Sequence, residues 1–339
     1  MTQNKGRRIT LEDVAMEAGV SRSLASLALR GDTGVSAERR AHILKVAARM
    51  NYVPDPHARN LASNGSRTIG VIVGTIENPF ISELVKAIDR AAREQGFDTL
   101  LSINGATDES AKAAANTFIS HRCAGLVLVA APANESHVVD IAERIPAVYI
   151  GRHSLNAKVN SVSNDNHLGA TLVVDHLVGL GHTRIACIDG GDGPGAGRRR
   201  EGYVAAMQTH GLTPLIVRGD YSIDAGWSGC TALFAGATTP TAIFAANDMT
   251  AIGVLNYLFR NGYRVPADIS VVGYDDMPFS ATAAIELTTV RQPVHQLASQ
   301  ALFSLSESIA GKKTSATHSL VVPELIVRKS TSANPAPPS

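Results

Sequence analysis

The chain has 339 residues, of which 45% are hydrophobic and 18% are charged, so it is long enough for two or three domains with a large core. This composition excludes an intrinsically disordered chain, and no apolar run reaches membrane-spanning length. The net charge of +1 is unevenly divided, because residues 1–67 carry 11 Lys and Arg against 6 Asp and Glu. The net charge is therefore +5 for this N-terminal segment and −4 for the remainder of the chain. A basic segment of this kind is typical of a nucleic-acid-binding domain, and a basic surface that only faces solvent is the alternative.

The first ten residues, MTQNKGRRIT, contain no apolar segment of a signal peptide, so we expect a cytoplasmic protein. The three cysteines lie far apart and have no C-x-x-C spacing, which predicts buried free thiols. They are Cys123, Cys187 and Cys230. We therefore expect no disulfide framework, no metal site and no cofactor.

Three helices are expected in the head, over residues 10–18, 21–29 and 36–52. Thr10 and Asp13 form a T-x-x-D capping box at the start of the first, and Ser21 is a good N-cap for the second. Gly19 supplies the turn between them. Two helices joined by a glycine-containing turn in a basic segment predict a helix-turn-helix, with a protein-binding three-helix bundle as the alternative.

The second helix must present its N-terminal residues to base edges while its apolar side rests on the other helices. The residues expected to face inward are Ala25, Ala28 and Leu29, and those expected to face outward are Arg22, Ser23 and Ser26.

Residues 51–67 differ in character, because Pro54 and Pro56 stop the third helix. Asp55 and Pro56 also suit the first residues of a short helix over 56–63. At about two turns this helix is too short to be stable alone in water. A plain linker is the alternative.

From residue 68 onward, strand and helix patterns alternate. The expected strands are 68–74, 97–103, 124–130, 146–150, 184–189, 213–219, 241–246 and 269–274. Apolar runs joined by helical crossovers indicate parallel sheets covered on both faces. Eight such units are too many for one ordinary open sheet, so we expect an α/β core of two doubly wound lobes that divide near residue 165. Residues 332–339 are expected to form a disordered tail.

The head carries ITLEDVAMEAGVSRSLASLALRG, and the core carries GLGHTRIA, AANDMTAIGVL, VPADISVVGYDD and LTTVRQP. With these motifs the chain resembles the LacI/GalR family of bacterial transcription regulators. The resemblance runs to about residue 330 and implies a DNA-binding head, a hinge helix and a core resembling periplasmic sugar-binding proteins. The implied boundaries are 1–53 for the head, 54–67 for the hinge helix and linker, 68–331 for the core, about 68–165 and 294–318 for the N-lobe, and about 166–293 and 319–331 for the C-lobe.

Carried over by position, the base-reading residues are Arg22, Ser23 and Leu27. Leu27 is a departure, because the family usually has an arginine there. A leucine can meet a thymine methyl but cannot make the bidentate contact to guanine, worth roughly 1–3 kcal/mol of discrimination, so Arg22 is the expected guanine reader. The phosphate-contacting residues, which hold register rather than choose sequence, are Thr10, Ser21, Arg30 and Ser36.

The hinge helix of the family folds when the dimer sits on DNA, and its leucine enters the minor groove. The corresponding residue is Leu61, with Ala58 one turn before it. An apolar wedge unstacks a base step and bends the duplex. Asp55 replaces the usual asparagine, and its carboxylate repels phosphate.

Effector residues are expected at the carboxyl ends of strands, in the cleft between the lobes. The resemblance selects Phe80, Arg199, Tyr221, Asn247, Asp275 and Gln292. Such polar groups can hold neighbouring hydroxyls while an aromatic ring covers an apolar ring face, which implies a sugar or phosphosugar as effector. Asp275 is alternatively a loop cap. Gly151 and Arg152 follow the fourth strand, where some family members have an aspartate.

The segment GGDGPGAGRRR, residues 190–200, offers a competing interpretation. It follows a strand and precedes a helix, and Asp220 ends the next strand, as in a dinucleotide-binding fingerprint. Pro194 interrupts the glycine spacing, so the corresponding function, a nucleotide-dependent oxidoreductase, is kept as the alternative. The same loop and residues 198–200 could hold an effector phosphate.

The combined prediction is a homodimeric repressor, not an enzyme, that binds a pseudo-palindromic operator. Effector binding changes lobe closure and so the spacing of the two hinge segments, with a coupling of about 1–3 kcal/mol. The tail lacks apolar heptads, which predicts a dimer rather than a tetramer. A sugar-binding module with no regulatory role is the second alternative.

Overall fold

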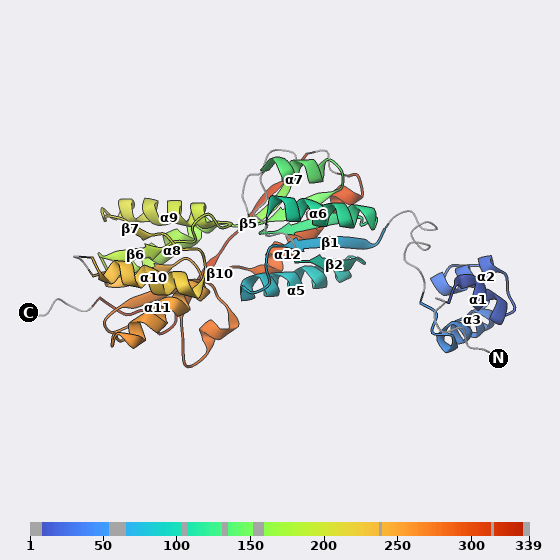
Figure 1. Cartoon of the computed structure of the whole chain (residues 1–339), viewed down its shortest axis with the longest axis horizontal. Coiled ribbons are helices and arrows are strands. Elements are labelled where there is room, and N and C mark those ends of the chain that lie inside the picture. The colour runs from blue at the N-terminus through green and yellow to red at the C-terminus, as the bar shows by residue number, and fades with distance from the viewer. Residues whose placement is uncertain are drawn as a thin grey trace, which may run out of the picture. The chain divides into compact units, whose positions relative to one another are not determined.

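The computed structural model describes residues 9–53, 66–103, 107–130, 135–151, 159–236, 239–312 and 315–334. The chain forms two compact units, one ending at Ser66 and the other beginning at Arg67 (Figure 1). The expected hinge residues Ala58 and Leu61 lie outside the described residues, as do Asp55 and Arg152.

The first unit contains the three expected helices, each begun by an N-cap side chain. They are α1 (Leu11–Glu17), α2 (Arg22–Arg30) and α3 (Ala37–Arg49). Thr10 and Asp13 form the expected capping box, and Ser21 and Ser36 cap the other two. Gly31 ends α2 with a φ of 79°, a left-handed conformation that suits glycine. The helices enclose a small core of buried apolar residues that includes Val14, Ala25, Ala28, Ile43 and Val46.

The first lobe of the second unit is built on a parallel sheet of six described strands in the order β11-β5-β4-β3-β1-β2. Its strands are β1 (Thr68–Val73), β2 (Asp98–Ser102), β3 (Gly125–Val129), β4 (Ala147–Ile150), β5 (Asn160–Asn164) and β11 (His318–Val321). The helices that cover it are α5 (Pro79–Glu94), α6 (Asp108–Ser120), α7 (Glu135–Ala142) and α12 (Val294–Ile309). Helices α5 and α12 pack on one face, and α6 and α7 pack on the other (Figure 1).

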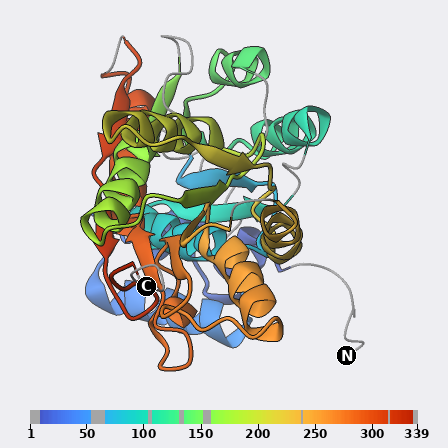
Figure 2. The same ribbon diagram turned by 90° about the vertical axis from the view of Figure 1, so that its left-hand side faces the viewer.

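The second lobe repeats this plan with the order β12-β10-β9-β8-β6-β7, in which β12 alone of the described strands runs antiparallel to its neighbour. Its strands are β6 (Ile185–Ile188), β7 (Leu215–Val217), β8 (Ala242–Ala245), β9 (Ser270–Asp275), β10 (Thr288–Arg291) and β12 (Glu324–Ile326). Its helices are α8 (Asn166–Gly179), α9 (Ala196–Thr209), α10 (Ile223–Phe234), α11 (Asp248–Arg260) and the 3-10 helix η1 (Pro278–Ala281). Helices α8 and α9 lie on the opposite face from α10 and α11 (Figures 1 and 2).

The two doubly wound lobes confirm the predicted fold class. In the described chain, three segments join the lobes, after β5, after β10 and after β11. The sequence analysis did not predict β5, β10, β11 and β12, whose segments contain polar or charged residues in place of a continuous apolar run. Strand β11 keeps the chain in the first lobe until Val321, past the expected boundary at residue 318.

The expected disordered tail is wrong for its first residues. The Ser332 amide donates to Ser270 Oγ at 3.1 Å, and the Asn334 amide donates to the Leu180 carbonyl at 2.8 Å. Polar contacts therefore hold the chain against the second lobe as far as residue 334, although its composition resembles that of a disordered segment.

The three cysteines are buried and free, as predicted. In the described part of the chain, no helix is both long enough and apolar enough to span a membrane. No group of His, Cys, Asp and Glu among these residues is arranged to hold a metal ion.

Candidate DNA-reading and effector-binding sites

Helix α2 divides into a packing face and an open face, largely as expected. Ala25 and Ala28 are buried, and Leu29 packs against the core of the head. Arg22 and Ser23 are exposed. Ser26, expected to face solvent, is only partly exposed, because Arg30 donates a hydrogen bond to its hydroxyl.

Leu27 belongs to the open face of α2 in spite of its apolar side chain. It is half-buried, and it lies outside the cluster of residues that forms the core of the head. Its neighbours Leu24 and Leu29 both pack on that core. Leu27 is therefore not needed to hold the three helices together.

The expected phosphate-contacting residues Thr10, Ser21 and Ser36 all lie at helix N-termini, where backbone N–H groups favour anions. The Ser21 hydroxyl accepts from the Leu24 amide at 3.2 Å, and Ser36 makes the equivalent contact. The structure describes no acceptor for either hydroxyl proton, so both can donate to a phosphate. Thr10 differs, because its hydroxyl donates to Asp13 Oδ2 at 2.7 Å.

The two arginines of α2 are held to different degrees. Arg30 Nε lies 2.7 Å from Asp32 Oδ2, and the same guanidinium contacts Ser26. Arg22 Nε lies 3.7 Å from Glu12 Oε2, and the Arg22 side chain is 69% exposed. Exposed ion pairs of this kind contribute little to the free energy of folding. Arg22 is therefore the arginine of α2 that can most easily turn toward another partner.

The second unit contains a cavity of about 490 Å³ to which both lobes contribute. All six residues expected to bind the effector line it: Phe80, Arg199, Tyr221, Asn247, Asp275 and Gln292. They come from segments that follow β1, β6, β7, β8, β9 and β10 or end one of these strands. Because the carboxyl ends of parallel strands meet at one edge of a sheet, residues far apart in the chain gather there.

Arg199 is the buried cation of this cavity and is 6% exposed. Its guanidinium carbon lies 3.6 Å from the centre of the Tyr274 ring, and Nε donates to Asn166 Oδ1 at 2.8 Å. It also donates to the Ala246 carbonyl. The ring and these two acceptors fix the guanidinium in one orientation.

Asp275 lies beside Arg199, with Oδ1 at 3.9 Å from Arg199 Nη2. Gln292 Nε2 donates to the same carboxylate oxygen at 2.6 Å. Burial raises the pKa of Asp275 to about 7, and the nearby guanidinium opposes this shift. Near neutral pH the group can therefore either accept or donate a hydrogen bond to a ligand.

Asn247 and Tyr221 form a second polar pair. Asn247 Oδ1 caps α11 by accepting from the Thr250 amide at 2.8 Å, and Nδ2 donates to the Tyr221 carbonyl at 3.1 Å. Tyr221 has a φ of 70°, and its hydroxyl donates to the Pro194 carbonyl at 3.0 Å. Asn247 thus positions Tyr221 in addition to lining the cavity.

The sequence did not identify Asn164, the last residue of β5, which lines the cavity and is 3% exposed. Its Nδ2 donates to the Tyr274 hydroxyl at 2.6 Å, but its Oδ1 has no hydrogen-bond partner among the described residues. Buried polar atoms are normally paired. A ligand hydroxyl would satisfy this oxygen. No sequence signal pointed to it, because NSVSN lacks the apolar run of a predicted strand.

Apolar side chains of the cavity come mainly from the first lobe. They include Phe80, Ile81, Leu84, Ile150 and Leu297. The charged and amide side chains beside Asp275 come mainly from the second lobe. A ligand that fills the space must therefore offer hydroxyl groups on one side and apolar surface on the other.

The glycine-rich loop that resembled a nucleotide motif forms part of the cavity wall. A Cβ on Gly190 would lie 2.2 Å from the Tyr221 ring, and one on Gly193 would lie 2.5 Å from it. Arg200 pairs with Asp189, and Arg198 pairs with Glu201 at 2.7 Å. Packing around Tyr221 accounts for these two glycines without a bound dinucleotide.

A helix-turn-helix unit followed by a two-lobed core with a polar cavity defines the class of ligand-responsive DNA-binding regulators. The pattern described as "Bacterial regulatory proteins, lacI family" matches residues 10–55, and that of a "Periplasmic binding protein-like domain" matches residues 174–331. The chain belongs to the lacI family of bacterial regulatory proteins and is a DNA-binding transcriptional regulator.

Its relatives include the ribose operon repressor of Escherichia coli (strain K12), which is 32% identical over 86% of this chain and 91% of that protein. The HTH-type transcriptional repressor CytR of the same organism is 31% identical, over 96% of this chain and 97% of CytR. The crystal structure of the Lac repressor dimer bound to operator and the anti-inducer ONPF has a TM-score of 0.88 and 30% identity. The match covers 96% of this chain and 100% of the Lac repressor chain.

Proposed function

We propose that this protein is a homodimeric repressor whose affinity for a pseudo-palindromic operator is set by a sugar or sugar derivative in the cavity. The observation that carries the proposal is the meeting, in one space of about 490 Å³, of all six ligand residues that the family resemblance selects. Asn164, with its unpaired buried oxygen, adds a polar group that a ligand can complete. The name of the ribose operon repressor supports the choice of a sugar.

In this proposal, Arg22, Ser23 and Leu27 contact base edges in the major groove. Ser21 and Ser36 donate to phosphates through their free hydroxyl protons. Thr10 and Arg30 supply further phosphate contacts by giving up their bonds to Asp13 and Asp32. Leu61, with Ala58 on the same helix, enters the minor groove at the centre of the operator and bends the duplex.

The effector changes the closure of the lobes, and this alters the spacing of the two hinge segments in the dimer. The coupling free energy between effector and operator is about 1–3 kcal/mol, as in other allosteric proteins.

An unphosphorylated effector fits the charges around the cavity better than a phosphosugar. Arg199 is held beside the Asp275 carboxylate, and the two arginines that flank it are paired with Glu201 and Asp189. A phosphate would have to displace one of these carboxylates or lie beside it. Neutral hydroxyl groups can instead use the carboxylate, the amides and the guanidinium together.

The test is a thermal-shift screen of the full-length protein against pentoses, hexoses, their phosphates, nucleosides and NAD. A specific ligand raises the melting temperature by mass action, and it should also change the affinity for an operator selected from random DNA. Asp275→Ala should abolish both effects of the ligand while leaving operator binding in its absence. A normal response in Asp275→Ala would contradict the proposed site, and a shift with NAD alone would favour the enzyme.

A further inference from the structure

The turn after β9 has an unusual backbone at two successive aspartates. Asp275 has a φ of 115° and Asp276 a φ of 55°, both in a region that residues other than glycine rarely adopt. Such conformations persist only where the surroundings hold them from several sides. Asp275 is also the carboxylate that faces the cavity, so whatever fixes this turn fixes the position of that carboxylate.

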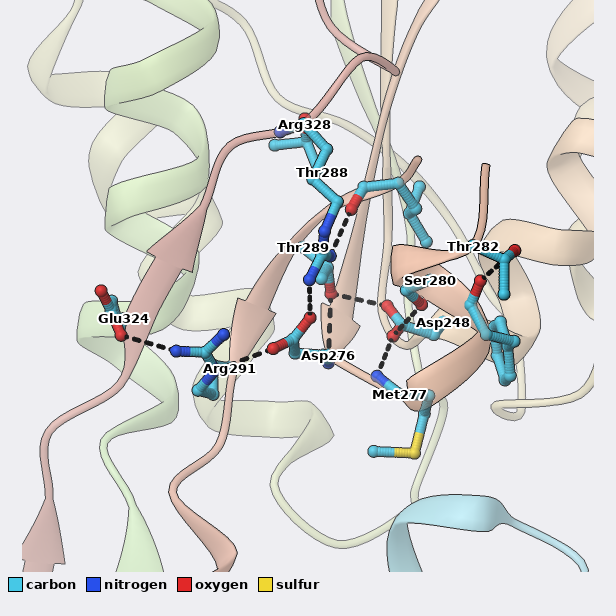
Figure 3. A network of polar contacts seen from close by, with 12 residues as sticks. Asp248, Asp276, Met277, Ser280, Thr282, Thr288, Thr289, Arg291, Glu324 and Arg328 are labelled. Carbon is cyan, nitrogen blue, oxygen red and sulfur yellow. Dashed lines mark hydrogen bonds and ion pairs between the residues drawn. The ribbon is translucent and has the colours of Figure 1, made fainter. Parts of the chain in front are cut away.

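The interior side of the turn is held by Asp248, which is fully buried. One oxygen of Asp248 accepts from the Met277 amide at 2.8 Å and from the Ser280 hydroxyl at 2.7 Å. The other accepts from the Thr289 hydroxyl at 2.6 Å (Figure 3). These contacts join α11, the start of η1 and β10 around the turn.

The opposite side of the turn is held by two arginines. Arg328 Nη2 lies 2.6 Å from one oxygen of the Asp276 carboxylate, and Arg291 Nε lies 2.7 Å from the other. Arg291 Nη1 continues to Glu324 Oε2 at 3.2 Å (Figure 3). Arg291 therefore bridges the carboxylate of Asp276, in the turn after β9, and that of Glu324, in β12.

The sheet register explains why Arg291 can do this. It is the partner of Asp275 in the parallel β9–β10 ladder and of Glu324 in the antiparallel β10–β12 ladder. Arg291 is the last residue of β10 before the chain leaves for the first lobe, and Glu324 is the first residue of β12 after its return. The residue after Arg291 is Gln292, which itself donates to Asp275.

We propose that Arg291 is a positioning residue that fastens two of the segments joining the lobes to the turn that carries Asp275. A change in lobe closure then moves the Asp275 carboxylate, and a ligand on Asp275 moves the joining segments in return. This regulation deepens the function proposed above and rests on the effector role given there to Asp275.

The test compares backbone amide hydrogen exchange of the full-length, ligand-free protein with that of two variants, Arg291→Ala and Glu324→Gln. The Arg291 side chain is 47% exposed and that of Glu324 is 68% exposed, so both variants keep the packed core. We expect several-fold faster exchange in peptides covering residues 275–277 in both variants. Asp268→Asn, which breaks the Arg264–Asp268 pair of the same lobe, is the control and should leave these peptides unchanged.

A purely local role for Arg291 predicts faster exchange at residues 291 and 324 with no change at 275–277, and that result overturns the proposal. A second measurement follows the carboxyl ¹³C signal of Asp275, assigned with Asp275→Asn, through a pH titration. Its midpoint should shift in Arg291→Ala, because the carboxylate is no longer held in place, and should stay unchanged in Asp268→Asn. If both measurements succeed while no ligand of the screen binds, the effector role fails and the positioning role stands.

Discussion

Leu27 and Arg22 differ in how they are placed to meet DNA. Leu27 is apolar yet lies outside the core of the head, so its side chain remains available for a methyl group. Arg22 is held loosely by Glu12, which leaves the guanidinium able to reorient. In the proposed function, the two residues together replace the arginine that the family resemblance implies at the position of Leu27.

Arg22→Ala should weaken binding to the selected operator by about 1–3 kcal/mol and binding to scrambled DNA by much less, since base contacts carry the discrimination. Titrations with both DNAs at one salt concentration give the comparison. Arg49→Ala, at the far end of α3 where Arg49 pairs with Glu17, is the matched loss of one positive charge. Equal losses on both DNAs for Arg22→Ala would remove its base-reading role.

Asp275 should make the ligand-free protein less stable as the pH rises. Its folded pKa of about 7 lies above that of an unfolded aspartate, so the folded state binds more protons between about pH 4 and 7. The stability contributed by the protonated form is complete below about pH 4 and is lost as the pH passes through 7. Asp248, whose pKa burial raises to about 6, acts in the same direction.

Urea unfolding between about pH 4 and 8 tests this slope. The free energy of unfolding of Asp275→Asn should fall less over this range, by on the order of 4 kcal/mol, than that of the wild type. Asp268→Asn should keep the wild-type slope in this range, because contacts with Arg264 hold the pKa of Asp268 at about 2. Parallel curves for the wild type and Asp275→Asn would contradict the raised pKa.

The cavity residues could be predicted where a family motif marks them, and could not where the local sequence gives no signal. Asp275 and Asn247 lie in distinctive segments, GYDD and AAND, at strand ends. Asn164 lies in a strand whose polar side chains are buried against residues far along the chain: Asn164 donates to Tyr274 and Asn160 to Ser308. No local pattern reveals such partners.

At the scale of elements, the loop after β6 also shows that a local sequence pattern cannot reveal contacts with distant residues. Its glycines resemble a phosphate-binding pattern locally, yet Gly190 and Gly193 are required by the ring of Tyr221, about 30 residues away. The apolar strands and capped helices were predictable, because their signals lie within each element. The strands β10 and β12 were not, since they lack an apolar run and are defined by pairing with other strands.

Gly190→Ala should displace the Tyr221 ring and destabilise the protein by about 1–3 kcal/mol, the usual cost of overpacking. It should also weaken ligand binding, because Tyr221 lines the cavity. Gly197→Ala is the control: a Cβ there meets no atom within 4 Å, and alanine in α9 adds up to about 1 kcal/mol of stability. Thermal melts with and without ligand compare the two. A dinucleotide site would instead make Gly197→Ala harmful to cofactor binding.

At the scale of the whole molecule, the first sheet ends in an apolar edge. Strand β2 is its outer strand, and Leu100 and Leu101 on it are 43% and 45% exposed. Ile103, just beyond the strand, is 48% exposed. An apolar edge strand left in solvent favours aggregation, so soluble proteins usually cover one. A second copy of the chain is the occupant that the proposed homodimer supplies.

Leu101→Glu should convert the dimer to a monomer, because a symmetric interface places the new charge on both subunits. Operator affinity should then fall by roughly 10²-fold or more, since two linked heads gain their affinity from simultaneous binding. Sedimentation equilibrium measures the first effect and operator titration the second.

The control is Val327→Glu, beside the edge strand β12 of the second sheet. Val327 is 58% exposed, and this variant should remain dimeric. A Leu101→Glu protein that sediments as a dimer would place the subunit interface elsewhere, and a wild-type tetramer would contradict the assembly predicted from the tail.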